Sequence, residues 1–110
     1  FHSQTNEAWF TKTPGLKVVY PAFPYDAKGL LNTSIADPNP VIYFEHKLLY
    51  RSVYQDVPTS YYTIPFGEAA TLRSGNKLTV LSFGAGVHWA LEIIDELQLT
   101  DIEVIDLRTL

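Results

Sequence analysis

Two strand–helix–strand patterns constrain the fold of this sequence more than any other feature. In the first, residues 16–20 and 41–44 are β-branched or aromatic runs, and residues 26–36 between them carry apolar side chains at helical spacing. The carboxylate of Asp26 can cap the start of this helix. The run 41–44 is apolar on both faces, as is usual for a strand of a parallel sheet covered by helices. This order of elements predicts a right-handed crossover between parallel strands. We therefore expect an α/β fold of parallel-sheet, three-layer units.

The second pattern lies near the end of the sequence. Residues 77–83 and 102–106 indicate strands, and residues 87–97 place apolar side chains on one helical face. The turn Gly84-Ala85-Gly86 could also be a phosphate-binding loop, since glycine lets backbone N–H groups approach an anion. The third glycine of the dinucleotide-binding fingerprint is missing, and a tight turn explains both glycines, so we predict no cofactor there.

Between the two patterns, residues 45–75 show no clear periodicity. They include two prolines and four tyrosines between positions 50 and 62. Because tyrosines normally pack against something, we predict an ordered linker rather than a flexible tether. Residues 64–73 fit either a strand or a short helical turn. We expect one domain part at 1–51, a linker at 52–76 and a second domain part at 77–110.

Composition and the chain ends narrow the class further. The sequence starts at Phe1 and stops soon after a strand-like run, which favours a piece that straddles two domains. The net charge of −4 argues against a nucleic-acid partner. No apolar run approaches the roughly 18–20 residues of a membrane span, so we expect no membrane contact. The absence of cysteine excludes disulfides, thiolate metal sites and a cysteine nucleophile, and fits a reducing cytoplasm.

His2 is the leading candidate for proton chemistry. Imidazole titrates near neutrality, so it can donate or accept a proton in a transition state. Ser3 is a good N-cap for a helix predicted at 3–12, which would place His2 at the mouth of that helix. The alternative is a histidine that only forms a hydrogen bond at a helix start.

The residues around His2 belong to a longer spaced pattern. It comprises His2-Ser3-Gln4, residues 7–10, 14–19 and 26–31, Pro21, Asp37, Asn39-Pro40, residues 45–51, Val57-Pro58, Gly84, His88 and residues 106–109. This pattern closely resembles the beta subunit of the thiamine diphosphate-dependent decarboxylating component of 2-oxoacid dehydrogenase complexes. The resemblance covers nearly the whole sequence.

The resemblance implies a fold and a site. Residues 1–51 would be the later part of a transketolase-like pyrimidine-binding domain, and residues 77–110 the start of a transketolase C-terminal-like domain. His2 would be an active-site histidine that assists proton transfer around the acyl intermediate and its passage to the lipoyl group. Ser3 and Gln4 would form the rim of the same site.

The resemblance also implies cofactors and partners outside this sequence. Thiamine diphosphate and magnesium would be bound mainly by an alpha subunit, or by an alpha part of a fused chain, and by an upstream glutamate. An α2β2 or fused-dimer assembly would pass the acyl group to a lipoyl-bearing acyltransferase, in the bacterial cytoplasm or the mitochondrial matrix. Residues 45–51, with Val57-Pro58 and Ile64-Pro65, look more like branched-chain (2-oxoisovalerate) than pyruvate members. The resemblance implies a thiamine diphosphate-dependent, acyl-transferring 2-oxoacid dehydrogenase of class EC 1.2.4. We expect the piece to be inactive when it is alone.

A second candidate site lies where the helix at 26–36 ends. Carbonyls freed at a helix C-terminus suit a monovalent cation. The resemblance implies a potassium ion bound by the backbone carbonyls of Ser34, Asp37 and Asn39. The alternative is an ordinary helix stop before Pro40.

The remaining polar and aromatic residues receive structural roles. We expect Glu7 and Glu45 to be surface or salt-bridge residues, His88 to pack on a helix face, and His46 to position its neighbours. The four tyrosines at 50, 54, 61 and 62 could form a stacking platform, but the acidic charge favours intersubunit packing.

Two other functions compete with the enzyme subunit. One is a non-catalytic α/β assembly module that keeps the fold and the tyrosine-rich surface without a cofactor. The other is a nucleotide-binding βαβ protein, for which we expect no measurable NAD or ATP affinity.

Overall fold

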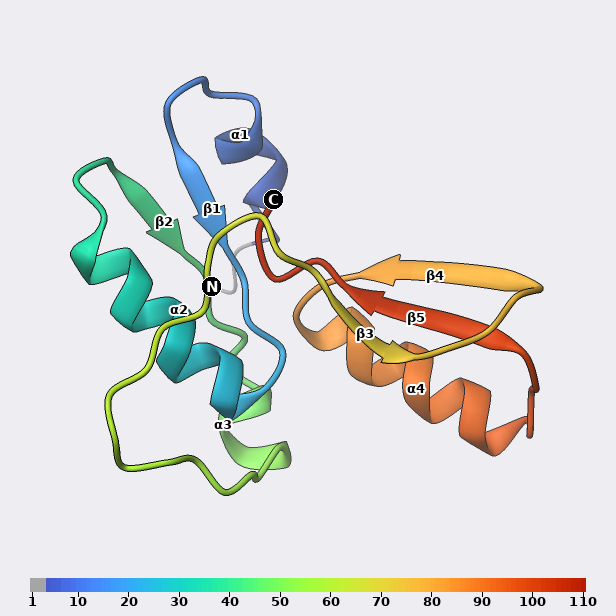
Figure 1. The fold of residues 1–110 in the computed structure, drawn as a ribbon. Helices are drawn as coiled ribbons and strands as arrows, with labels where there is room; N and C mark the ends of the chain where they lie inside the picture. The colour runs from blue at the N-terminus through green and yellow to red at the C-terminus, as the bar shows by residue number, and fades with distance from the viewer. Residues whose placement is uncertain (1–3) are drawn as a thin grey trace.

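The computed structural model describes residues 4–110, which form two α/β lobes (Figure 1). In the first lobe, β1 (Lys17–Val19) and β2 (Val41–Tyr43) are parallel, with Lys17 opposite Val41, and α2 (Pro24–Ala36) connects them. In the second lobe, β4 (Leu78–Ser82) and β5 (Ile102–Asp106) are parallel, and α4 (Ala85–Glu96) connects them. The two predicted crossovers and the α/β class are confirmed.

The second lobe contains one strand that periodicity did not separate from a helical turn. β3 (Ala70–Arg73) pairs antiparallel with β5, so the strand order of this sheet is β3-β5-β4. The pairing is irregular between Thr71 and Arg73. β3 lies within the segment predicted as linker, and its pairing with β5 joins residues far apart in sequence, such as Ala70 and Asp106, which local periodicity does not reveal.

Each lobe has its own apolar core. Val19, Leu30 and Ile64 form the first, and Ile94, Ile102 and Val104 form the second. Ile64 belongs to the connector, and its backbone N–H donates to the Gly29 carbonyl at 3.2 Å. The connector is therefore an ordered segment packed along α2 and not a flexible tether.

The predicted start of the first helix is wrong. Residues 4–6 are not helical, and α1 spans only Glu7–Thr11, with Asn6 at the N-cap position and no side-chain cap bond. Ser3, the predicted cap, lies outside the described residues. A single turn needs tertiary contacts to persist. The Phe10 ring supplies one, with its centroid 5.7 Å from that of Phe44.

The predicted cap of the second helix is also wrong. α2 begins at Pro24, where the missing N–H of proline costs nothing, and Phe23 is the N-cap residue. Asp26 lies inside the first turn and is buried. Its carboxylate bonds the side chain of Arg108 instead of the helix end. A further short helix, α3 (Leu49–Ser52), lies where the pattern indicated no element.

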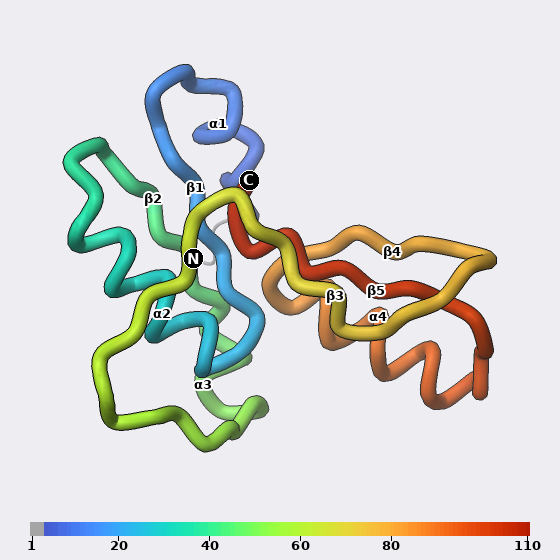
Figure 2. Tube along the Cα trace, viewed as in Figure 1, coloured from blue at the N-terminus to red at the C-terminus, as the bar shows by residue number. Residues whose placement is uncertain are grey.

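The last residues of the chain tie the two lobes together (Figure 2). After β5 the chain runs back along β1: the Tyr20 N–H donates to the Arg108 carbonyl and the Leu110 N–H to the Val18 carbonyl, each at 2.9 Å. A β-bridge joins Val19 to Thr109. Within the described part of the chain, no helix is long and apolar enough to cross a membrane.

Candidate functional site

A cavity of about 210 Å³ lies between the two lobes, and we call it the inter-lobe cavity. Tyr20, which follows β1, and Ser82, which ends β4, both line it. His46, three residues after β2, lines it as well. The carboxyl ends of three parallel strands therefore converge here, which is the position where α/β sheets usually bind ligands.

Of the three residues predicted at the His2 site, only Gln4 lies among the described residues, and it does not line this cavity. His2 and Ser3 fall outside the described residues, so their roles stay predictions. Gln4 is exposed, and Thr5, three residues after His2 in the sequence, lines the cavity.

Glu7 contributes a buried carboxylate to the cavity. Its residue is only 8% exposed, and among residues 4–110 it takes part in no ion pair. The expectation of a surface role for Glu7 is therefore wrong. Burial, together with the negative charge of Glu7, raises the pKa of the Tyr20 hydroxyl, which stays protonated as a hydrogen-bond donor. Glu45, by contrast, is exposed as expected.

His46 offers a second polar atom near the cavity. Its Nδ1 is buried and has no hydrogen-bond partner within the described part of the chain. This nitrogen is therefore free, within the described residues, to form a hydrogen bond with a ligand. Sequence reasoning treated His46 only as a positioning residue, because nothing in the pattern of residues 45–51 reveals burial.

The glycines that begin α4 serve packing. Gly84 has φ +54°, and a Cβ at this position would lie 2.8 Å from the Tyr20 ring. Only glycine combines that backbone conformation with the close approach of the ring. The close contact with Tyr20 therefore explains why the predicted tight turn has glycine at position 84.

A group of polar side chains joins the two lobes, and we call it the junction cluster: Asp26, His88, Asp106 and Arg108. The Arg108 guanidinium donates to the Asp26 carboxylate at 2.8 Å, and the Arg108 backbone N–H donates to Asp106 Oδ1 at 3.1 Å. His88 Nε2 lies 2.7 Å from the Ala22 carbonyl, so this nitrogen carries the proton. His88 also packs against the Phe23 ring, at 4.7 Å between centroids, which confirms helix-face packing and extends it across the two lobes.

Asp106 is the most unusual member of the junction cluster. It is 0% exposed, and its Oδ2 has no hydrogen-bond partner among the described residues. Burial raises the pKa of this carboxyl to about 6, and the nearby Asp26 charge adds to the effect. The Arg108 backbone N–H, the Arg108 guanidinium and His88 oppose the increase.

We expect this carboxyl to make stability depend on pH. Its pKa rises from 3.8 unfolded to about 6 folded, so the native state binds the extra proton between those values. Stability should therefore fall as pH rises through that window, by about 2–3 kcal/mol for the Asp106 contribution. The variant Asp106→Asn cannot titrate. Urea unfolding at pH 4 and pH 7 should show wild type losing stability relative to this variant, and a difference that is the same at both pH values would contradict the expectation.

The C-terminus of α2 holds the predicted potassium ligands. The Asp37 carboxylate accepts hydrogen bonds from the Lys17 ammonium and from the Asn39 backbone and side chain. The Lys17 bond, followed by those from Asn39, lowers the pKa of Asp37 to about 2. The Ser34 hydroxyl donates to the Leu30 carbonyl at 2.7 Å. The Asp37 carboxylate and the Ser34 hydroxyl are thus engaged within the protein, while the predicted ligands are backbone carbonyls.

The stacking platform considered for the four tyrosines, and set aside in favour of intersubunit packing, is not formed by them within the described residues. Tyr62 stacks on Tyr25 with 4.6 Å between ring centroids, whereas Tyr50, Tyr54 and Tyr61 are exposed. The same residues, 4–110, contain no group of three or more His, Cys, Asp or Glu side chains that could hold a metal ion.

Comparison with known proteins matches each lobe to a known domain family. Residues 1–53 match the family "Transketolase, pyrimidine binding domain", and residues 67–110 match "Transketolase, C-terminal domain". The two parts of this α/β chain therefore match the two transketolase domain families, as the sequence resemblance implied.

The relatives that this chain resembles are beta subunits of 2-oxoacid dehydrogenases. The chain is 46% identical over 111 residues to the 2-oxoisovalerate dehydrogenase subunit beta of Bacillus subtilis (strain 168), which covers 99% of this chain and 34% of the relative. It is 47% identical over 110 residues to the pyruvate dehydrogenase E1 component subunit beta of the same strain, with 98% and 34% covered. A mitochondrial 2-oxoisovalerate dehydrogenase subunit beta from Dictyostelium discoideum is 44% identical over 113 residues, with 100% and 30% covered.

These matches have two limits that matter for function. The chain spans about a third of the length of the curated relatives it matches. Its identities to the 2-oxoisovalerate and pyruvate relatives are nearly equal, so overall identity does not separate the two substrate types.

Proposed function

We propose that this chain is part of the beta subunit of a thiamine diphosphate-dependent 2-oxoacid dehydrogenase. The full assembly would decarboxylate a 2-oxoacid oxidatively and transfer the acyl group to a lipoyl-bearing acyltransferase. The observation that carries the proposal is the match of nearly the whole chain, at 46–47% identity, to beta subunits of this class.

Within this proposal His2 is the proton-transfer residue, with Ser3 and Gln4 at the rim. Thiamine diphosphate supplies the electron sink when it is bound. The protein's part is to orient reacting groups and to move a proton at the His2 imidazole. The inter-lobe cavity supports this placement, because Thr5 lines it close to His2 in sequence and because it holds the Glu7 carboxylate and the His46 imidazole.

The cofactor and its metal require groups beyond these residues. The described part of the chain offers no three-residue cluster for a divalent ion. We therefore assign the diphosphate and magnesium to an alpha subunit or a fused alpha part, in an α2β2 or fused-dimer assembly. The aminopyrimidine-binding glutamate is assigned to sequence upstream of Phe1.

We also propose potassium at the C-terminus of α2. The last carbonyls of a 13-residue helix carry partial negative charge, and this supports a monovalent cation at the Ser34, Asp37 and Asn39 carbonyls. The Lys17 ammonium beside Asp37 opposes it.

The preferred substrate in this proposal is 2-oxoisovalerate, on the basis of residues 45–51, Val57-Pro58 and Ile64-Pro65. We expect the full-length protein with its alpha partner to show kcat/KM for 2-oxoisovalerate about tenfold or more above that for pyruvate, because the extra methyl groups add apolar contact. Omitting thiamine diphosphate should abolish turnover. A preference for pyruvate would overturn the substrate assignment. Calorimetric titration of the whole assembly that detects no thiamine diphosphate binding would instead favour the non-catalytic assembly module.

A further inference from the structure

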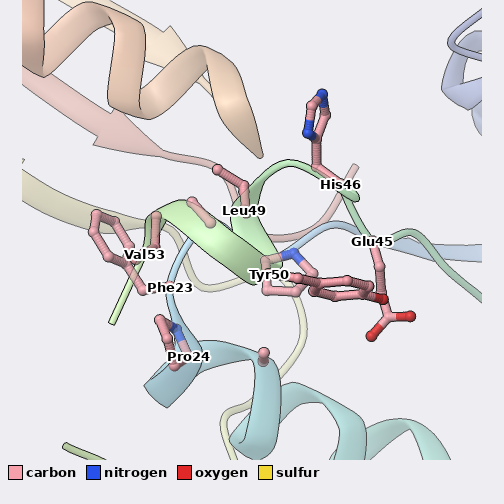
Figure 3. A pocket seen from close by; sticks show the side chains of 10 residues that line it. Phe23, Pro24, Glu45, His46, Leu49, Tyr50 and Val53 are labelled. Carbon is pink, nitrogen blue, oxygen red and sulfur yellow. The ribbon is translucent and has the colours of Figure 1, made fainter. Parts of the chain in front are cut away.

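A second cavity, of about 290 Å³, lies beside α3 on the first lobe, and we call it the α3 pocket (Figure 3). Loops at residues 21–24 and 45–46 line it, and these follow β1 and β2 respectively. The α3 pocket thus opens at the carboxyl edge of two parallel strands, which is where α/β sheets usually bind ligands. It is separate from the inter-lobe cavity, although His46 borders both.

The α3 pocket is apolar except at one end. Phe23, Leu49 and Val53 supply apolar wall, while Glu45 and Tyr50 bring their oxygens together at the opposite end (Figure 3). A hydrogen bond to the Glu45 carboxylate raises the pKa of the Tyr50 hydroxyl, so Tyr50 remains a neutral donor beside a charged acceptor. The His46 ring turns to the other side of the chain (Figure 3). The α3 pocket therefore has apolar walls and one negative charge, on Glu45, at one end.

That charge has no cationic partner in the described part of the chain. Of the three ion pairs there, none includes Glu45. A carboxylate at the end of an apolar wall is complementary to a side chain with an aliphatic stem and a cationic head, which is the chemistry of Lys and Arg. The net charge of −4 adds a general attraction for a basic surface.

The rim of the α3 pocket has the composition of a protein interface. Tyr50 lines the pocket and is exposed, and Leu48 and Tyr54, each next in sequence to a lining residue, are exposed as well, Tyr54 to 84%. Exposed tyrosine and leucine around a pocket are typical of surfaces that a partner covers, because aromatic anchors carry much of the binding energy. A free small amine would leave this rim uncovered, whereas a partner chain would cover it.

We propose that the α3 pocket receives a Lys or Arg side chain of a partner chain, with the stem against Phe23, Leu49 and Val53 and the cation on Glu45. This inference rests on the proposed two-chain enzyme, in which the partner is the alpha subunit. It adds a specific electrostatic anchor to that assembly and assigns it to residues of this chain.

The test compares the full-length protein with its Glu45→Gln variant by calorimetric titration against the alpha partner. Loss of the charge should raise the dissociation constant about tenfold or more. The partner would cover Glu45, and removing one member of a charge pair buried at an interface mainly raises the dissociation rate. The affinity of the variant should also fall less steeply with added salt. Glu96→Gln, on the exposed end of α4, removes the same charge elsewhere and should leave the affinity unchanged.

An unchanged dissociation constant for Glu45→Gln would overturn the proposal. So would weaker self-association of Glu45→Gln with unchanged alpha affinity, because the occupant would then be a second copy. Circular dichroism melting confirms that each variant is folded. Thiamine-dependent turnover at saturating partner is read separately: its absence in the unaltered protein counts against the proposed function, while the titration still decides what occupies the α3 pocket.

Discussion

Replacing His2 with Ala in the full-length protein is expected to slow acyl transfer to the lipoyl group by about 10²- to 10⁴-fold, the usual contribution of a positioned proton-transfer group. Thiamine diphosphate affinity should be unchanged, because the diphosphate and metal are assigned to other residues. The loss should therefore fall on kcat. The pH dependence of kcat should also lose the inflection near neutrality that an imidazole produces.

Single-turnover acylation of a lipoyl domain measures this expectation directly. The matched control is His88→Ala, which removes an imidazole that bonds the Ala22 carbonyl and packs on Phe23. This control should lower the melting temperature but leave the rate and pH profile of the folded enzyme intact. Equal rates for wild type and His2→Ala would show that His2 has no catalytic role.

Local periodicity was enough to predict the two crossovers. Residues 16–20 and 102–106 alternate or run apolar over the length of a strand, and their flanking turns are marked by Gly15 and Pro21 or by a polar run. The predicted starts of the first two helices were wrong, because the contacts that decide where a helix begins are partly tertiary. Asp26 looked like a cap, and its carboxylate instead bonds a residue 82 positions away.

The misses at the candidate site have the same cause. Glu7 is polar in sequence and buried in the structure, because α1 packs beside Tyr20 at the end of β1. β3 was left undecided, because its pairing with β5 is not local. The only sequence signal for the junction cluster was the resemblance at residues 26–31, His88 and residues 106–109, which marked these positions without showing what they contact.

Arg108 is the residue on which the junction cluster depends most. Its backbone has φ +58°, a left-handed conformation that costs a non-glycine residue about 1–2 kcal/mol. Three bonds hold it there: the guanidinium to Asp26, the N–H to Asp106 and the carbonyl to the Tyr20 N–H. The ion pair is well buried, with side chains 19% and 5% exposed for Arg108 and Asp26.

We expect Arg108→Met to lower the free energy of unfolding by about 3 kcal/mol, because it leaves the Asp26 carboxylate buried without a cation. Urea unfolding of the full-length protein at pH 7 measures the change. The matched control is Arg73→Met, which breaks the Arg73–Asp95 pair at 3.2 Å, where the side chains are 33% and 76% exposed. Such an exposed pair contributes about 1 kcal/mol or less. Adding Asp26→Asn to Arg108→Met should recover part of the loss, because the unpaired charge is then gone. If Arg108→Met costs no more than Arg73→Met, the junction cluster does not hold the two lobes together.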